Sequence, residues 1–590
     1  MPPQGPWSHL RRYRARVTVG IGALLITNIA ALTVPWLLGR TIEALQGSDP
    51  GGDVPPLAAA MVGFALLQAI VRIVSRVTLF NAARMGEHDL RADLFEHLMH
   101  MDAAWFRKNP TGDVMSRLTN DVQTVRALWG PGLLNLINTT FVFATGLVLM
   151  LRIDPVLTLW ALVPYPAVFF LGQAFGRRIY KASRAVQDKL GALSSSVQED
   201  LTGVAVIKNY TLERQRERRF VRMSKELLDE NMVVTRIRGT MMPILGAMAS
   251  IGTVMVIYVG GHAVASGRIS LGELVQFNAY LALLVWPTLA LGWMISLVQR
   301  GFASWSRLAY ILDAQPGIVG GPRTLPANSR GALSVSDLTV DVGGRRLLDR
   351  VSLDIPAGQT TAVVGRTGCG KSTLIEALAR LIEVPAGAVR IDGIDIRELT
   401  LPALRGAIGY APQEAFLFST TIADNIAMGL DHRPGGPPAD AGERRRLVEQ
   451  AAQAAGLDRD LRALPHGLDT LVGERGITLS GGQRQRVALA RALASEPTVL
   501  LLDDSLSSVD AETERQILGH LDRVLAGRTA VLVSHRVAAV RRAQRIAVID
   551  GGRVVEQGSH AELLAADGLY AELYRDQMAE ELADIKEAAS

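Results

Sequence analysis

Long apolar stretches dominate the first half of the chain, and each approaches the ~20 residues that a helix needs to cross a bilayer core. They predict six membrane-spanning helices, at Val17–Gly39, Leu57–Phe80, Leu133–Leu151, Val156–Phe175, Met242–Val264 and Leu274–Val298. No cleavage-like end follows the first stretch, so we expect it to be retained as a span rather than removed as a signal peptide.

Basic residues flank the first span on one side only. Arg11, Arg12, Arg14 and Arg16 precede it, whereas residues 41–56 after it contain no Lys or Arg. Because cytoplasmic flanks carry the excess of Lys and Arg, we expect both termini in the cytoplasm and a multi-pass protein of the plasma (inner) membrane. The long connections, residues 81–131 and 176–241, would then be cytoplasmic.

Those long connections show helical rather than loop-like patterning. In the first, Leu90, Leu94, Leu98 and Met101 form one apolar stripe at helical spacing. The spans are therefore predicted to continue as helices beyond the membrane, where the stripes need a surface to contact.

The pattern changes after a Pro/Gly-rich stretch that reads DAQPGIVGGPRTLPANSR. Short apolar strands then alternate with helical segments, which is typical of an α/β domain with a largely parallel sheet. We expect a membrane all-α six-helix transmembrane domain fused to a cytoplasmic α/β P-loop nucleotide-binding domain. The predicted boundaries are 17–302 for the membrane domain, 313–331 for the linker, 332–568 for the nucleotide-binding domain and 569–590 for a tail.

Composition agrees with a membrane bundle joined to a water-soluble half. The 590 residues are 48% hydrophobic with mean hydropathy +0.20, yet 20% are charged. A net charge of only +5 does not indicate a nucleic-acid partner. The one cysteine, Cys369, rules out an intrachain disulfide framework.

The stretch GRTGCGKST follows the apolar run TTAVV, precedes a helical pattern and fits the P-loop consensus G-x-x-x-x-G-K-S. Its glycines let backbone N–H groups surround phosphates, and the helix that follows directs its positive end at the same anion. We therefore predict a nucleotide site formed by Gly365, Arg366, Thr367, Gly368, Cys369, Gly370, Lys371, Ser372 and Thr373. Lys371 would neutralise the β- and γ-phosphates, and Ser372 would ligate Mg²⁺.

Two further motifs lie downstream. The apolar run TVLLLD predicts a buried parallel strand that delivers Asp503 to the ligand edge of the sheet, where it would hold Mg²⁺. The run LSGGQRQR predicts another helix start suited to phosphate, at Ser480, Gly481, Gly482 and Gln483. Because the chain already has one phosphate loop, the simplest use of this second start is a nucleotide held by a second copy of the domain.

The order of GRTGCGKST, Gln413 in YAPQE, LSGGQ, LLLDD, SSVD and His535 in VSHR resembles the nucleotide-binding domain of ATP-binding cassette (ABC) transporters. VGERG, before the signature motif, is similar to the X-loop of exporters in this superfamily. Six spans before one such domain resemble an exporter half-transporter, with intracellular coupling regions beginning near Thr111 and Thr202. The resemblance covers essentially the whole chain.

The resemblance implies roles for individual residues. ATP, with Mg²⁺ held by Ser372, Gln413 and Asp503, would lie between one P-loop and the signature Ser480 to Gln483 of a partner chain. Lys371, Gln413, Asp504 and His535 would act in hydrolysis, Gln413 as a sensor and His535 on the γ-phosphate and attacking water. ATP binding would close two cassettes and hydrolysis would reopen them, so that the membrane helices alternate in access.

Two positions depart from the family pattern. Asp504 stands where hydrolytic members carry glutamate, and a displacement of about 1 Å can cost roughly a hundredfold in rate. The usual base-stacking aromatic is replaced near Val342, removing stacking worth roughly 1–3 kcal/mol. Both predict a weak own site beside an intact signature, hence one half of a heterodimeric exporter. A homodimer with slow turnover is the alternative.

The sequence indicates the substrate only by class. By analogy we expect a hydrophobic drug-like or lipid-like small molecule, exported by a transport-coupled ATPase in contact with membrane lipid. A catalytically weak, ATP-binding regulatory or channel-like subunit is the alternative function. Arg72 and Arg76 either attract anionic substrates, snorkel to the interface or lie beyond the membrane. Six span residues either line a cavity or pack against lipid and neighbours: Trp160, Tyr165, Phe169, Trp286, Trp293 and Met294.

Overall fold

The computed structural model describes residues 5–433, 436–473, 476, 478–504, 519, 525–534 and 537–588. The chain forms two compact units. One comprises Met1–Met99 and Pro110–Ala314, and the other comprises His100–Asn109 and Gln315–Ser590.

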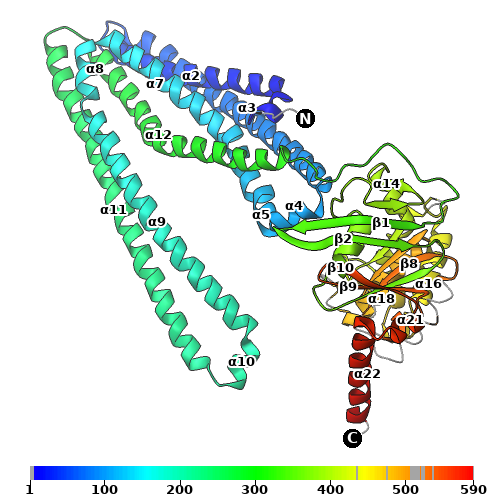
Figure 1. Cartoon of the computed structure of the whole chain (residues 1–590). Helices are drawn as coiled ribbons and strands as arrows, with labels where there is room; N and C mark the ends of the chain where they lie inside the picture. Colours follow the sequence, from blue (N-terminus) through cyan, green and yellow to red (C-terminus); the bar gives the residue numbers. More distant parts are fainter. Residues whose placement is uncertain are drawn as a thin grey trace. The chain divides into compact units, whose positions relative to one another are not determined.

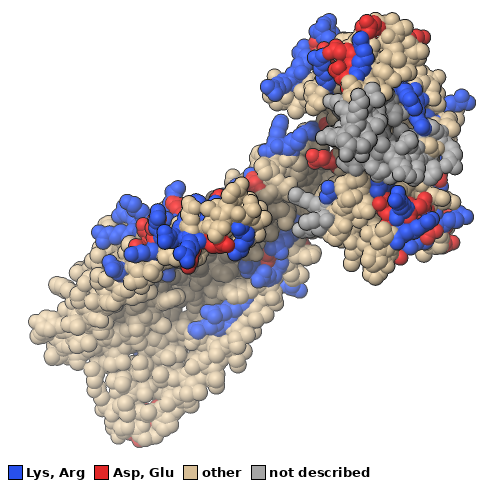
Figure 2. All heavy atoms as spheres, turned by 90° about the horizontal axis from the view of Figure 1, so that it is seen from below, with Lys and Arg blue, Asp and Glu red and all other residues tan. Residues whose placement is uncertain are grey.

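The first unit is helical in its described residues. Its elements are α1 (Ser8–Arg11), α2 (Arg14–Leu45), α3 (Pro50–Met99), α5 (Thr111–Ser116), η1 (Arg117–Asp121), α6 (Val122–Ala127), η2 (Leu128–Gly132), α7 (Leu133–Ile153), α8 (Pro155–Leu162), α9 (Pro164–Thr202), α10 (Val204–Asn209), α11 (Glu213–Ala265) and α12 (Leu271–Leu312). Six helical runs are long and apolar enough to cross a membrane, which confirms the predicted all-α membrane domain. Figure 2 shows a broad area of this unit with almost no charged side chain, as expected of a surface that faces lipid.

Small residues allow the spans to approach closely. A Cβ at Gly20 of α2 would lie 2.6 Å from the Leu79 side chain of α3, and the Ser75 hydroxyl donates to the Gly20 carbonyl at 3.0 Å. A Cβ at Gly272 of α12 would lie 2.4 Å from the carbonyl oxygen of Gly39 in α2. The glycines at these crossings therefore set the separation of the helices.

Helices α9 and α11 run side by side and lead to the short helix α10 (Figure 1). Lys189 and Glu226 join them by an ion pair of 2.6 Å. Around α10 the apolar side chains are uncovered in the described part of the chain: Leu201 is 70% exposed, Val206 56% and Tyr210 68%. The predicted stripe at Leu90, Leu94 and Leu98 on α3, by contrast, is buried inside the unit.

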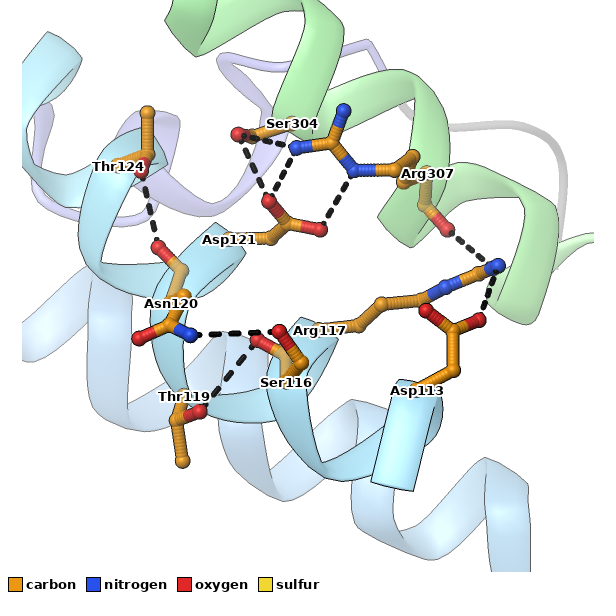
Figure 3. A network of polar contacts seen from close by, with 9 residues as sticks. All are labelled: Asp113, Ser116, Arg117, Thr119, Asn120, Asp121, Thr124, Ser304 and Arg307. Carbon is orange, nitrogen blue, oxygen red and sulfur yellow. Dashed lines mark hydrogen bonds and ion pairs between the residues drawn. The ribbon is translucent and has the colours of Figure 1, made fainter. Parts of the chain in front are cut away.

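A polar network joins η1 to α12 (Figure 3). The Asp121 carboxylate accepts hydrogen bonds from the Ser304 hydroxyl at 2.9 Å and from Nε of Arg307 at 2.8 Å. Arg117 pairs with Asp113 at 2.7 Å and also donates to the Arg307 carbonyl at 3.4 Å. These contacts fasten the last part of α12 to the η1 segment.

The second unit is an α/β domain with two sheets. The strands are β1 (Leu333–Val342), β2 (Arg345–Ile355), β3 (Thr360–Val364), β4 (Val389–Ile391), β5 (Ile394–Asp395), β6 (Ile408–Ala411), β7 (Val499–Asp503), β8 (Thr529–Val533), β9 (Arg545–Asp550) and β10 (Arg553–Gly558). One sheet has the order β2-β1-β4-β5 and the other β10-β9-β3-β8-β7-β6. In the larger sheet β9, β3, β8, β7 and β6 are parallel, as the sequence predicts.

Helices and the small sheet cover both faces of the larger sheet. The described helices of this unit are α4 (Ala103–Lys108), α13 (Lys371–Leu378), α14 (Leu401–Ala407), α15 (Ile422–Ala427), η3 (Leu430–His432), α16 (Ala441–Ala454), α17 (Asp458–Ala463), η4 (Gly467–Asp469), α18 (Gly481–Ala494), α20 (Val537–Val540), α21 (His560–Ala565) and α22 (Leu569–Ala588). Leu501 of β7 packs in one core with α13 and the small sheet, whereas Leu500 and Leu502 pack in another with α15, α16 and α18. Burial on both faces explains the unbroken apolar run of β7.

Helix α4 groups with the second unit although it lies between membrane helices in the sequence. Asp102 caps it by accepting from the Trp105 N–H at 2.8 Å, and its other oxygen accepts from the Gly317 N–H at 2.7 Å. Arg107 lies 3.5 Å from Glu376 on α13. This short helix therefore contacts, within its own unit, the helix that follows the P-loop.

Candidate nucleotide-binding site

The P-loop lies between β3 and α13, as predicted, and its glycines are structurally required. Gly368 and Gly370 have φ of 80° and 108°, a backbone region that favours glycine. A Cβ at Gly365 would lie 2.1 Å from the Ile549 carbonyl, and one at Gly370 would lie 2.7 Å from the Leu347 carbonyl. Backbone atoms of the neighbouring strands thus lie so close to Gly365 and Gly370 that there is no room for a side chain at either position.

Lys371 is buried at the start of α13. Its ammonium group donates to the carbonyls of Gly365 at 2.8 Å and Arg366 at 2.9 Å, and it lies 3.9 Å from the sulfur of Cys369. Burial raises the pKa of the Cys369 thiol, so this cysteine is uncharged at neutral pH. The positive charge of Lys371 is therefore held inside the phosphate loop.

The Ser372 hydroxyl donates to the Asp503 carboxylate at 3.2 Å. Asp503 is buried at the end of β7, and burial, followed by the charges of Asp504 and Glu376, raises its pKa. In the described part of the chain no cation is hydrogen-bonded to this carboxylate. A hydroxyl beside a buried carboxylate is the donor set that Mg²⁺ prefers, so these residues fit the predicted metal.

Asp504 follows the strand in an uncommon backbone conformation. Its φ is 43°, its N–H donates to the Val533 carbonyl of β8 at 2.9 Å, and its side chain is buried. The chain leaves the sheet at this residue, and the Asp504 carboxylate is close enough to Asp503 for its charge to raise the pKa of that group.

The signature motif begins α18, as predicted. Ser480 caps the helix by accepting from the Gln483 N–H at 3.2 Å, and the Gln483 side chain accepts from the Ser480 N–H at 2.9 Å. Asp460 holds the amide of Gln483 at 3.2 Å and the guanidinium of Arg486 at 2.6 Å. The helix start is thus rigid, while Ser480 and Gly481 remain exposed.

Gln413 is exposed on the segment after β6. Its backbone carbonyl accepts from the side-chain amide of Gln485 at 3.3 Å, which links this segment to the signature helix. His535, the SSVD segment and two residues of VGERG, Glu474 and Arg475, lie outside the described residues.

Sequence reasoning missed Glu376 and Tyr410 beside Asp503. Burial, followed by the charges of Asp503 and Glu376, raises the pKa of Tyr410. Glu376 could have been found, because it lies one helical turn after Ser372 and so shares its side of α13. Tyr410 lies 93 residues before Asp503 in the sequence, and only the pairing of β6 with β7 brings the two together.

A cavity of about 320 Å³ lies among α9, α11 and α12 in the first unit. Apolar side chains dominate it, and the described lining includes Tyr165, Thr253, Asn278 and Thr288 but no charged residue. Of the six span residues singled out in the sequence, Tyr165 lines this cavity. Trp160, Trp286 and Trp293 are exposed, Met294 is buried, and the side chain of Phe169 is not described.

Comparison with known proteins agrees with this geometry. Residues 17–288 match the family described as ABC transporter transmembrane region, and residues 348–507 match the one described as ABC transporter. The chain is 35% identical over 574 residues to the probable multidrug resistance ABC transporter ATP-binding/permease protein YheI of Bacillus subtilis, with 96% of each chain covered.

Two further similarities span nearly the whole chain. The ATP-dependent lipid A-core flippase of Vibrio vulnificus is 32% identical over 579 residues, with 97% of each chain covered. Among solved structures, that of a bacterial Atm1-family ABC exporter with ATP bound has a TM-score of 0.77 and 26% identity, covering 96% of this chain and 98% of the other.

Proposed function

We propose that this chain, which belongs to the ABC transporter family, is the half of an exporter whose own P-loop site hydrolyses ATP slowly. Membership of the family makes it an integral membrane half-transporter that couples ATP hydrolysis to export. The observation that carries the proposal is Asp504, an aspartate where the resemblance predicts glutamate, beside the paired Ser372 and Asp503.

ATP would bind with its phosphates in the P-loop. Phosphate oxygens would replace the carbonyls of Gly365 and Arg366 as partners of the Lys371 ammonium group. Ser372, Asp503 and Gln413 would hold Mg²⁺, which when bound neutralises phosphate charge. The exposed N–H groups at the start of α18 would bind the nucleotide of a partner chain, because a helix N-terminus stabilises an anion.

Asp504 would leave the attacking water poorly placed. Its carboxylate is one methylene shorter than glutamate, and the buried side chain has little freedom to move forward. ATP at this site would therefore persist through several transport cycles. Because it contacts both cassettes, it would stabilise the closed dimer, as a ligand stabilises the state to which it binds. Turnover would occur at the partner's P-loop against Ser480 to Gln483 of this chain.

Helices α4 and α10 would carry the coupling. Arg107 of α4 contacts Glu376 near the metal site of its own cassette. The uncovered apolar side chains around α10 fit a second cassette, supplied by the partner half-transporter. The arginines before α2 support an N-terminus in the cytoplasm and insertion in the inner membrane.

The cavity among α9, α11 and α12 would hold part of the substrate. Its volume lies in the range of small-molecule sites, about 300–1,000 Å³. Because none of the described residues that line it is charged, the substrate is expected to be apolar with few hydrogen-bonding groups, as drug-like and lipid-like molecules are.

ATPase assays on the purified chain, alone and with its partner half-transporter, test the division of roles. Asp504→Asn should cost little activity in the assembled pair, and removing the partner's glutamate should abolish most of it. Full activity of the chain alone that vanishes in Asp504→Asn would refute the proposal and favour a homodimer. ATP-dependent transport of a substrate in vesicles would exclude the alternative that this chain is a regulatory subunit, because a catalytically silent subunit moves no substrate.

A further inference from the structure

The β1–β2 hairpin has a defined tip. Gly343 and Gly344 form its two-residue loop with φ of 60° and 80°, which is typical of a type I′ turn. Val342 and Arg345 flank the turn and pair directly across the two strands. Because side chains of directly paired residues project to the same face of a sheet, Arg345 lies beside the position where the family resemblance expects a base-stacking aromatic.

The same hairpin borders the phosphate loop. The carbonyl oxygen of Leu347 lies 2.7 Å from where a Cβ of Gly370 would stand, and the Leu348 side chain lies 2.8 Å from it. Arg345 precedes Leu347 by two residues, roughly 7 Å along an extended strand. An arginine side chain at the tip is therefore within reach of a nucleotide whose phosphates lie in the loop.

Arg345 differs from its neighbours in having a free guanidinium group. Arg346 is held by Asp341 at 3.3 Å and by Asp349 at 3.4 Å. Arg345 is exposed and has no side-chain hydrogen bond or ion pair within the described residues. The run from Leu338 to Arg350 contains no aromatic residue, so Arg345 is the planar side chain available at the tip.

We propose that the Arg345 guanidinium contacts the nucleobase and lets this site accept GTP at least as well as ATP. The inference rests on the proposed nucleotide binding at the P-loop. A guanidinium plane stacks on the face of either purine. At the edge of the base, as the alternative to stacking on its face, arginine matches guanine specifically, because it donates two hydrogen bonds to O6 and N7, whereas adenine presents an amino donor in place of O6.

Equilibrium binding to the purified full chain in detergent with Mg²⁺ tests this inference. The probes are ATP, GTP and inorganic tripolyphosphate, which has the phosphates but no base. Arg345→Ala should weaken ATP binding by roughly fivefold and GTP binding by more, on the scale of one lost base contact, and leave tripolyphosphate unchanged. Arg350→Ala is the matched control, because it removes an exposed arginine of the same strand away from the tip.

A second variant separates stacking from hydrogen bonding. Arg345→Tyr should keep ATP binding, because an aromatic ring also stacks, and should lose the relative gain for GTP. An equal loss of all three probes in Arg345→Ala would show attraction to phosphate alone and overturn the inference. Unchanged GTP binding would overturn it too. If the unaltered chain bound none of the probes, the proposed nucleotide site itself would be wrong.

Discussion

Asp121 and Arg307, 186 residues apart in the sequence, form a two-point ion pair between η1 and α12 (Figure 3). Nε of Arg307 donates to one carboxylate oxygen at 2.8 Å, and Nη2 donates to the other, which also accepts from Ser304. Burial alone would raise the pKa of Asp121, but the hydrogen bonds from Arg307 and Ser304 outweigh it and hold the pKa below its usual value. The pair therefore stabilises the ionised carboxylate.

Arg307→Ala should lower the melting temperature of the purified chain, because it leaves the Asp121 charge largely buried and unpaired. Breaking a buried pair costs about 3–5 kcal/mol, and the exposure of Arg307 places this case below that range. Arg307→Lys should restore only part of the loss, since lysine cannot bind both oxygens. The control is Arg300→Ala, which changes an exposed arginine two turns earlier on α12.

The same pair predicts a pH dependence of stability. Since the pKa of Asp121 is lowered, the contribution of its ionised carboxylate to the free energy of unfolding is present at neutral pH and is lost as the pH falls below about 4.

Asp503→Asn should stabilise the chain against heat in the absence of Mg²⁺ and nucleotide. The raised pKa of Asp503 means that its ionised form costs free energy of folding at neutral pH, and this cost disappears as the pH falls below the raised pKa. Removing the charge should raise the melting temperature by roughly 2–4 °C, which corresponds to about 1 kcal/mol. The same variant should lose the further stabilisation that MgATP gives the unaltered chain. A lower melting temperature without ligand would contradict the assignment.

Arg107→Ala and Glu376→Gln should shift the Mg²⁺ requirement for nucleotide binding in opposite directions. Arg107 neutralises Glu376, whose charge acts on Asp503. Loss of the arginine should lower the half-saturating Mg²⁺ concentration, and loss of the carboxylate should raise it, each by roughly two- to fivefold for a partly exposed pair. Combining the two changes should bring the value back toward the original, because both charges of the pair are then removed together. If Arg107→Ala behaves like the neighbouring Lys108→Ala, the ion pair does not act on the site.

Val206→Asp should uncouple ATP hydrolysis from transport. The change places a charge in the uncovered apolar surface around α10, which we propose docks on the partner's cassette. ATP binding should stay intact, while transport per ATP hydrolysed in proteoliposomes falls by roughly tenfold or more, as expected when about 1.4 kcal/mol of docking is lost. Val233→Asp changes an exposed valine on α11, outside α10, and should reduce transport much less. Undiminished transport in Val206→Asp would place the contact elsewhere.

Gly246→Phe should reduce transport by filling the cavity among α9, α11 and α12. Gly246 lines the cavity, and no atom lies within 4 Å of where its Cβ would stand, so a larger side chain fits without distorting the helix. Gly261→Phe is a matched control, because this glycine lies on the same helix with equally open surroundings and does not line the cavity. Basal ATPase activity should persist in both variants. Equal transport by the two would exclude the cavity as part of the substrate path.

Local sequence patterns alone predict several elements of this protein. The six spans follow from the length and apolarity of single segments, because a bilayer demands both within one continuous helix. The P-loop at Gly365 to Thr373 and the capped start of α18 at Ser480 are equally local, since each is set by residues within a few positions. The buried strand that ends at Asp503 was readable for the same reason.

Only the tertiary structure decided which distant residues meet. It placed Tyr410 beside Asp503, paired Asp121 with Arg307 and grouped His100–Asn109 with the nucleotide-binding unit instead of the membrane helices that flank it. No local rule predicts these contacts, because each depends on how strands order themselves in a sheet or how far a helix extends before it turns. Arg345 is a further example. From the sequence it is an arginine in a hairpin like any other, and only the packing of β2 against Gly370 brings it to the nucleotide loop.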